Sequence, residues 1–209
     1  ILDGAKNFYS KSPSGSWIPY SSLKNKEVLI IGAGNSVLKH KIALEDFIRQ
    51  KNIIVIALNT INNIKNELIN FRIACHPIRL LADIKIYNNF PQPLIMPASM
   101  LGKDLLENIK SDKILDFGIN IKNDTFEAYE HYCIVPYPIV LAYALGVVKS
   151  GSAKKVYIAG IDGYELGDPR NDEINSLFKI SSCENLGLTS LTPTIYKHTI
   201  VESVYGFKF

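Results

Sequence analysis

The sequence has 209 residues, of which 47% are hydrophobic and 21% are charged, a composition that suits one domain with a sizeable core. The net charge is only +3, from 23 basic and 20 acidic residues, and no window carries a long run of one sign. The sequence therefore lacks the electrostatic footprint of a nucleic-acid-binding protein, and we expect no nucleic-acid partner.

The first 26 residues are expected to form a lead-in or linker. Their part from Asn7 to Lys26 is rich in Ser, Lys and Asn and holds two prolines, as connecting segments often do. The sequence starts without Met, and no basic segment followed by a long apolar one marks a signal peptide. We therefore expect a processed chain or a segment of a longer protein, with one domain over residues 27–209.

An apolar run at 28–31 breaks into the turn Gly32-Ala-Gly-Asn-Ser36 and leads into a helix-like segment. Glycines such as Gly32 and Gly34 let the backbone pass close to a bulky polar ligand, while Asn35 and Ser36 can cap the next helix and leave its N–H groups facing an anion. The turn lacks the last glycine of the dinucleotide fingerprint and the Gly-Lys-Ser/Thr of a P-loop. It indicates a phosphate-bearing ligand, with a plain tight connection as the alternative.

From residue 27 onward, short β-rich runs alternate with helix-like segments. This alternation predicts an α/β fold with a doubly wound, mostly parallel Rossmann-like sheet of about six to seven strands and helices on both faces. Helices are expected at 36–51 and at 137–149, the second packed against the sheet. The expected strands cover residues 28–31, 53–58, 71–75, 94–96, 114–117, 155–159 and 188–191.

Candidate site residues follow the strands, because ligands of doubly wound sheets bind at the carboxyl ends of the strands. Asn59 follows the second expected strand, His76 follows the third, and Gly160-Ile-Asp-Gly-Tyr164 follows the strand at 155–159. Each alone could be a helix cap or a turn former. Their convergence at one edge of the sheet indicates a single site.

The strand-end motifs resemble those of the Rossmann-like bacterial sialyltransferases that use CMP-sialic acid without a metal, over most of residues 27–193. This resemblance implies that the first turn and Asn59 hold the ribose and phosphate of a cytidine nucleotide, and that Tyr164 binds the departing phosphate. Asp162 is assigned to the same nucleotide-binding set. The residues that carry the resemblance are Gly32, Gly34, Ser36, Asn59, His76 with Pro77, and Ala159-Gly-Ile-Asp-Gly-Tyr164.

Related segments resemble the tail portions of larger bacterial proteins that have an aldolase-like barrel and act in surface-carbohydrate pathways. The resemblance thus implies an upstream domain of the same polypeptide as a partner, together with a CMP-type nucleotide sugar and a carbohydrate acceptor. It implies no cofactor.

The sialyltransferases place a general-base His between the Gly-Ile-Asp-x-Tyr motif and the last strand, whereas residues 165–187 contain no His. Two other residues are therefore candidate bases: His76, before Pro77, and His198, past the expected strand at 188–191. Imidazole suits the role because it titrates near neutral pH. His40 is expected at the surface and His131 in a structural role.

Arg170 lies six residues after Tyr164, where the family has a second phosphate-facing Tyr. Its guanidinium could neutralise a leaving phosphate through charge-assisted hydrogen bonds. The alternative is that Asp168-Pro-Arg-Asn is only a turn, with Asn171 or Asp172 as the N-cap of a helix that runs through Phe178.

Other site types find little support in the sequence. No metal is expected, because His and acidic residues lack metal-ligand spacing. Three cysteines without CxxC spacing indicate buried thiols in a reduced, cytoplasmic protein: Cys75, Cys133 and Cys183. The longest apolar-rich stretch, 134–148, holds two prolines and is shorter than the ~20 residues of a membrane span.

Two functional hypotheses follow. The first is a glycosyltransferase-like domain that moves a sugar, of an acidic nine-carbon type, from a CMP donor. The second is a binding or regulatory module that keeps the nucleotide-type fold without catalysis and serves a larger aldolase-like enzyme. Dinucleotide redox chemistry is disfavoured, because Asn59 stands where a ribose-binding acid is expected.

Overall fold

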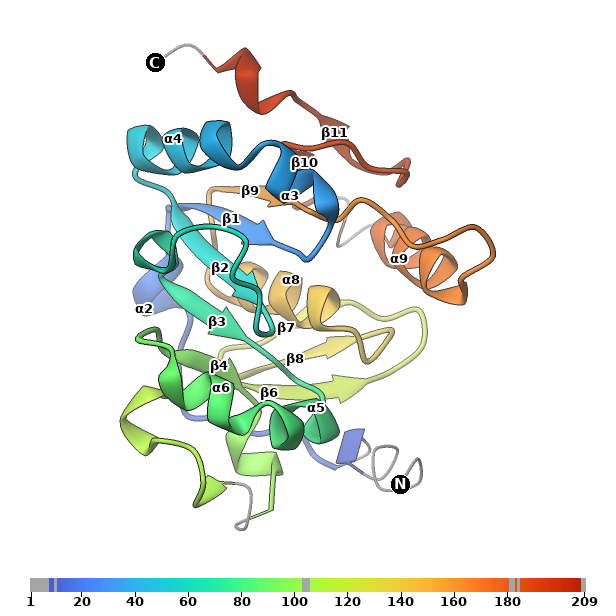
Figure 1. Ribbon diagram of the computed structural model, residues 1–209. Helices are drawn as coiled ribbons and strands as arrows, with labels where there is room; N and C mark the ends of the chain where they lie inside the picture. The colour runs from blue at the N-terminus through green and yellow to red at the C-terminus, as the bar shows by residue number, and fades with distance from the viewer. Residues whose placement is uncertain (1–7, 10, 103–105, 181–182, 184, 208–209) are drawn as a thin grey trace.

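The computed structural model describes residues 8–9, 11–102, 106–180, 183 and 185–207. Eight parallel strands form the central sheet in this part of the chain (Figure 1). They are β1 (Glu27–Ile31), β2 (Ile54–Leu58), β3 (Phe71–Ile73), β4 (Leu94–Met96), β5 (Ile114–Asp116), β9 (Lys155–Ala159), β10 (Thr189–Ser190) and β11 (Ile200–Val201).

The strand order is β11-β10-β9-β1-β2-β3-β4-β5. From β1 the chain winds outward to β5 and then returns to β9 on the other side of β1, with Leu29 opposite Val55 of β2 and Tyr157 of β9. The order therefore reverses between β1 and β9, which is the switch point where such folds bind ligands. The predicted doubly wound, mostly parallel Rossmann-like sheet is confirmed, with eight strands instead of six to seven.

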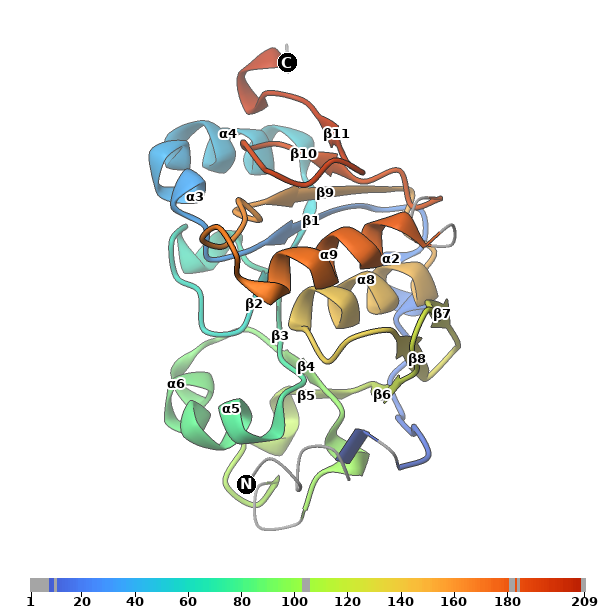
Figure 2. The ribbon, with the colours of Figure 1, turned by 90° about the vertical axis from the view of Figure 1, so that its right-hand side faces the viewer.

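Helices cover both faces of the sheet (Figure 2). Their bounds are α2 (Tyr20–Leu23), α3 (Asn35–Lys39), α4 (Lys41–Lys51), α5 (Pro77–Ala82), α6 (Ile84–Asn89), α8 (Val140–Ser150) and α9 (Pro169–Lys179), with short 3-10 turns η1 (Asn66–Leu68), η2 (Ala98–Met100), η3 (Ser111–Lys113) and η4 (Val204–Gly206).

Alternate residues of each strand point to opposite faces, and this divides the core in two. Leu29 and Val55 pack with Phe47 of α4, whereas Ile30 and Ile56 pack with α8 and α9 on the other face. The helix predicted at 36–51 is two helices, because the chain leaves the helical conformation at His40 between α3 and α4. None of the described helices exceeds 11 residues, and none has the length and hydrophobicity of a bilayer-spanning segment.

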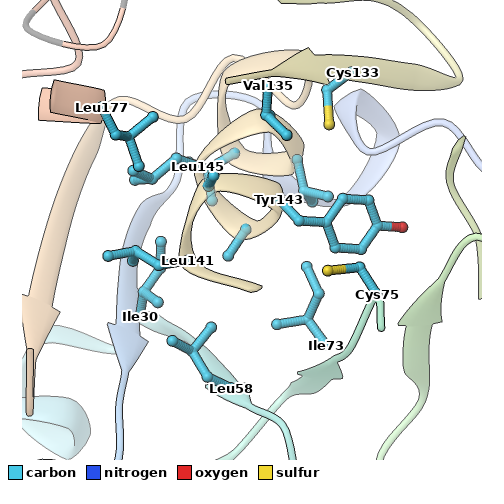
Figure 3. Close-up of a cluster of buried hydrophobic side chains, with 14 of the residues drawn as sticks. Ile30, Leu58, Ile73, Cys75, Cys133, Val135, Leu141, Tyr143, Leu145 and Leu177 are labelled. Carbon is cyan, nitrogen blue, oxygen red and sulfur yellow. The ribbon is translucent and has the colours of Figure 1, made fainter. Parts of the chain in front are cut away.

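Helix α8 is buried on nearly all sides, as predicted from its apolar composition, and it spans 140–150 instead of 137–149. Its outer side is covered by a small second sheet that the sequence did not predict: β6 (Gly118–Ile121), β7 (Glu127–Ala128) and β8 (Tyr132–Val135), in the order β6-β8-β7. Figure 3 shows Leu141, Tyr143 and Leu145 of α8 between the central sheet and β8. The Tyr143 hydroxyl donates to the Phe117 carbonyl, so this buried phenol is satisfied.

The three cysteines are buried, as expected for structural thiols. Burial raises the pKa of the Cys75 thiol to about 12, which keeps it protonated at neutral pH.

The described part of the expected lead-in packs on the domain. Phe8, Tyr9 and Leu23 are buried in the main core. The backbone N–H groups of Ser16 and Trp17 both donate to the Asp116 carbonyl, at 3.0 and 2.9 Å. The segment between these anchors exposes Lys11, Ser12, Ser14, Ser16 and Ser21, so its composition does not reveal the apolar contacts.

The close packing between α8 and β8 can be tested by a substitution at Gly146. A Cβ atom at this position would lie 2.6 Å from the Cys133 sulfur and 2.7 Å from its Cβ. Gly→Ala inside a helix is usually stabilising. Here we expect Gly146→Ala to lower the free energy of unfolding by about 1–3 kcal/mol through overpacking, measured by urea denaturation. Combining it with Cys133→Ala should recover part of the loss, and a stabilising Gly146→Ala would contradict this packing.

Candidate functional site

The loops after β1 and β9 meet backbone to backbone at the switch point. Gly32 N–H donates to the Ala159 carbonyl at 2.8 Å, and Gly34 N–H donates to the Gly160 carbonyl at 2.9 Å. A Cβ at Gly32 would overlap the Gly160 carbonyl, and Gly160 has a φ of +69°, a conformation that favours glycine. These glycines therefore let the two loops close on each other, whereas the sequence indicated room for a ligand.

Asp162 reaches from the β9 loop to the first turn of α3. Its Oδ2 accepts from Ser36 N–H at 2.8 Å, and its Oδ1 accepts from the Ser36 hydroxyl. A side chain at Gly34 would overlap this carboxylate. The expected capping by Asn35 and Ser36 is wrong: Gly34 is the N-cap, Asn35 is the first helical residue, and Ser36 donates to Asp162. The carboxylate occupies the place where the sequence predicted an anion.

Tyr164 and Arg170 lie together beside this turn, at the start of α9. The Arg170 guanidinium stacks 3.8 Å from the centre of the Tyr164 ring, and both side chains are exposed. Tyr164 N–H donates to Asn171 Oδ1 at 2.9 Å, and the Asn171 amide donates back to the carbonyls of Tyr164 and Glu165. The first turn of α9 thus fixes the loop that carries Tyr164.

The N-cap of α9 is Asp168, not Asn171 or Asp172 as the sequence suggested. Its Oδ1 accepts from Arg170 N–H and from Arg170 Nε, both at 2.9 Å, and Oδ2 pairs with the guanidinium. These bonds lower the pKa of Asp168 to about 2. Pro169 at the first helical position favours this start. Arg170 is consequently paired within the chain and is not an uncompensated cation.

Asn59 and His76 follow β2 and β3 as predicted. Asn59 adopts a φ of +54°, and its N–H donates to the Ile73 carbonyl at 2.8 Å. His76 is half-buried and stands at the N-cap position of α5 without a capping side-chain bond. Burial, and secondarily the positive charge of Arg79, lowers the pKa of His76.

Buried Arg72 holds the loop between Asn59 and β3, and no local sequence pattern marks this role. Its guanidinium donates to the Ile61 carbonyl at 2.6 Å, to Asn66 Oδ1 at 2.7 Å and to Gln92 Oε1 at 3.1 Å. Burial lowers its pKa to about 10. This network replaces a crossover helix between β2 and β3, and it fixes the backbone that presents Asn59.

His198 lies at the other edge of the sheet. It stands two residues before β11 and lines a cavity of about 330 Å³ with Gly187 and Leu188, which precede β10. The amino ends of β10 and β11 meet here, because the two strands are parallel. The expected grouping of His198 with Tyr164 and Arg170 is thus not found, since the connection after β10 returns to the amino edge before His198.

A larger pocket of about 410 Å³ opens at the carboxyl ends of β10 and β11, and the sequence did not indicate it. His40 is partly exposed and lines this pocket, and its Nδ1 lies 3.2 Å from the Tyr205 hydroxyl. His131 is half-buried beside Glu130. Within the described residues, no group of three or more His, Cys, Asp and Glu gathers as a metal site.

The comparisons with known proteins point to the fold. No protein-family model matches the chain, and no significant match was found among curated proteins. Among solved structures, the MAf glycosyltransferase from Magnetospirillum magneticum AMB-1 is similar, with a TM-score of 0.65 and 11% identity. The match covers 98% of this chain and 38% of that glycosyltransferase. The chain therefore shares a glycosyltransferase-like fold and spans well under half the length of this neighbour.

The bond pair between Ser36 and Asp162 should contribute measurably to stability. We expect Asp162→Ala to lower the free energy of unfolding by about 2–3 kcal/mol, because it leaves a part-buried N–H without its charged partner. Ser36→Ala should cost about half as much, since the backbone bond remains. Exposed Asp172→Ala is the matched control. If urea denaturation shows that Asp162→Ala is as stable as Asp172→Ala, Asp162 does not stabilise the contact between the loops after β1 and β9.

The pKa of His76 can be measured by NMR titration. We expect a midpoint below the ordinary value of 6.5, and a rise in Arg79→Ala because the neighbouring positive charge is removed. Arg49→Ala is the control for a distant arginine. Because the unfolded chain binds this proton more readily, the contribution of His76 to stability falls as the pH drops below 6.5. A midpoint at or above 6.5 would contradict the burial.

Proposed function

We propose that this domain binds a nucleotide sugar of the CMP type at the switch point and transfers its sugar, of the sialic-acid type, to a carbohydrate acceptor. The observation that carries the proposal is the pairing of Tyr164 with Arg170 at the start of α9, beside the loops of β1 and β9. A phenol and a guanidinium together can stabilise a leaving phosphate without a metal ion.

The position of the phosphate follows from the carboxylates around it. Asp162 fills the N-terminus of α3, and a phosphate there would meet a negative charge. Arg170 presents five N–H donors, of which Asp168 engages those on Nε and Nη2. We therefore assign the phosphate to the α9 side of the switch point, against Arg170 and Tyr164.

The rest of the nucleotide sugar would extend along the carboxyl edge toward β3. Asn35 and Asn59 lie on this side, after β1 and β2, and can donate or accept hydrogen bonds with ribose and base. His76 follows β3, three strand positions from β9, which corresponds to ~14 Å at the usual strand spacing. An extended nucleotide sugar is long enough to bridge such a separation.

The proposed step is a direct displacement. The acceptor hydroxyl oxygen forms a bond to the anomeric carbon of the donor sugar, and the bond from that carbon to the phosphate oxygen breaks. The electron pair leaves with the phosphate of CMP, next to Arg170 and Tyr164, while the hydroxyl proton passes to solvent water. His76 lies too far along the edge to reach a hydroxyl that attacks beside this phosphate, and we propose that it contacts the far end of the nucleotide instead.

A second candidate is a catalytically inactive, nucleotide-fold module that serves a larger aldolase-like enzyme. It is favoured by the internal pairing of both anion-binding elements, α3 with Asp162 and Arg170 with Asp168. Under either function we propose a role in bacterial surface-carbohydrate metabolism and an upstream domain, both supported by the resemblance of the strand-end motifs. We also propose a cytoplasmic location, supported by the three buried thiols.

Calorimetric titration with CMP, against UMP, AMP and NAD, tests the nucleotide site. We expect saturable, CMP-selective binding that weakens about tenfold in Arg170→Ala and to a smaller extent in Tyr164→Phe. Lys179→Ala, at the other end of α9, should bind CMP normally. Asp168→Asn should bind CMP more tightly, because Asn caps a helix as well as Asp and releases Arg170.

Failure of all four ligands to bind would overturn the nucleotide site. Binding of CMP without hydrolysis or transfer of a CMP-sugar would favour the inactive module. Weaker CMP binding in His76→Gln would support a contact of His76 with the far end of the nucleotide.

A further inference from the structure

The pocket of about 410 Å³ lies between the segments that follow β10 and β11. One side is formed by residues 191–194 and the other by residues 201–205, with His40 from the end of α3. The first segment is joined to the candidate site: the Thr192 hydroxyl oxygen accepts from Gly160 N–H at 3.0 Å, and the Thr194 hydroxyl donates to the Ile161 carbonyl at 2.7 Å. The pocket therefore adjoins the β9 loop of the switch point.

An aromatic pair stands at the mouth of the pocket. The rings of His40 and Tyr205 meet edge to face with centroids 5.6 Å apart, and the hydrogen bond between them fixes the imidazole against the phenol. Tyr205 is 66% exposed and Val201 is 59% exposed, so both offer apolar surface to a ligand in the pocket. Buried Leu191 and Val204 lie behind them. This wall suits the apolar C–H face of a ring.

The pocket also has a polar part, the Glu202 carboxylate, which can accept hydrogen bonds. The Glu202 side chain is about half exposed, and its nearest described cation is Lys155, at 3.9 Å, a weak surface pair. No Lys or Arg lines the pocket among the residues that the structure describes. The pocket therefore combines an aromatic and aliphatic wall with a carboxylate, and it lacks a charge that would hold an anion.

We propose that this pocket binds the ring of a neutral carbohydrate, with its C–H face on Tyr205 and Val201 and its hydroxyl groups donating to Glu202. A hydrocarbon would leave the carboxylate without a partner, and an acidic sugar would be repelled by it. The pocket is distinct from the nucleotide site at Tyr164 and Arg170. In the framework of the proposed function, on which this assignment rests, it is the subsite of the acceptor.

The test is NMR titration of the isotope-labelled chain with the methyl glycosides of galactose, glucose, mannose and N-acetylglucosamine, without nucleotide. N-acetylneuraminic acid and cyclohexanol serve as the acidic and apolar comparisons. We expect at least one neutral glycoside to shift the signals of His40, Tyr205 and residues 192–194 saturably, in the millimolar range, and more strongly than either comparison ligand.

Variants then assign the binding to the pocket. Tyr205→Ala and Glu202→Gln should each weaken binding about tenfold, the equivalent of 1.4 kcal/mol of contact energy. Tyr205→Phe keeps the ring and should bind nearly normally, which separates stacking from unfolding. Tyr20→Ala, at a tyrosine 43% exposed outside the pocket, is the control and should leave binding unchanged.

Three results would overturn the proposal: no shift with any of the four glycosides, equal or stronger binding of cyclohexanol or the acidic sugar, or unchanged binding in both Tyr205→Ala and Glu202→Gln. The outcome is independent of the nucleotide titration. Glycoside binding without CMP binding would support the carbohydrate pocket but rule out its assignment as an acceptor subsite. CMP binding without glycoside binding would rule out the carbohydrate pocket and leave the nucleotide site standing.

Discussion

Two hydrogen bonds from Ser36 to the Asp162 carboxylate join the loops that follow β1 and β9. These loops belong to the two halves of a doubly wound sheet, and they come from chain segments more than a hundred residues apart. Gly32, Gly34 and Gly160 permit the contact because they carry no side chain between the loops. The geometry of everything at the switch point, including the loop that carries Tyr164, depends on this junction.

The same device recurs at the far edge of the sheet, which indicates that Asp162 is structural. Asp116, at the end of β5, accepts from Ser99 N–H at 2.9 Å and from the Ser99 hydroxyl, in the turn after β4. In both places a carboxylate at the end of one strand fixes the turn after its neighbour. Asp162 is thus better explained as a residue that positions the site than as one that touches the nucleotide.

Much of the fold could be predicted from local sequence. All seven expected strands correspond to observed ones, because parallel strands buried on both faces give continuous apolar runs. The short strands β6, β7 and β8 were missed for different reasons: β6 contains the polar Asn120, β7 has only two residues, and the apolar run of β8 merges with the apolar-rich stretch at 134–148. The last strand, β11, has only two residues and gives no recognisable pattern.

The site was predicted less well, because its determinants are not local. The rule that ligands bind after strands leads to Asn59 and Tyr164, which both follow carboxyl ends of strands in the structure. The return of the chain after β10, which carries His198 to the amino edge, depends on a pairing between β10 and β11 that no local pattern encodes. The Asp162 and Asp168 carboxylates, the Arg72 network and the contact of His40 with Tyr205 likewise become visible only when distant segments are brought together.

The most direct test of this account is the position of the phosphate in a crystal structure of the chain with CMP. We predict that the phosphate lies beside Arg170 and Tyr164 at the start of α9, with the bonds between Asp162 and Ser36 intact. A phosphate at the N-terminus of α3 with Asp162 displaced, or a nucleotide bound away from the switch point, would contradict the account.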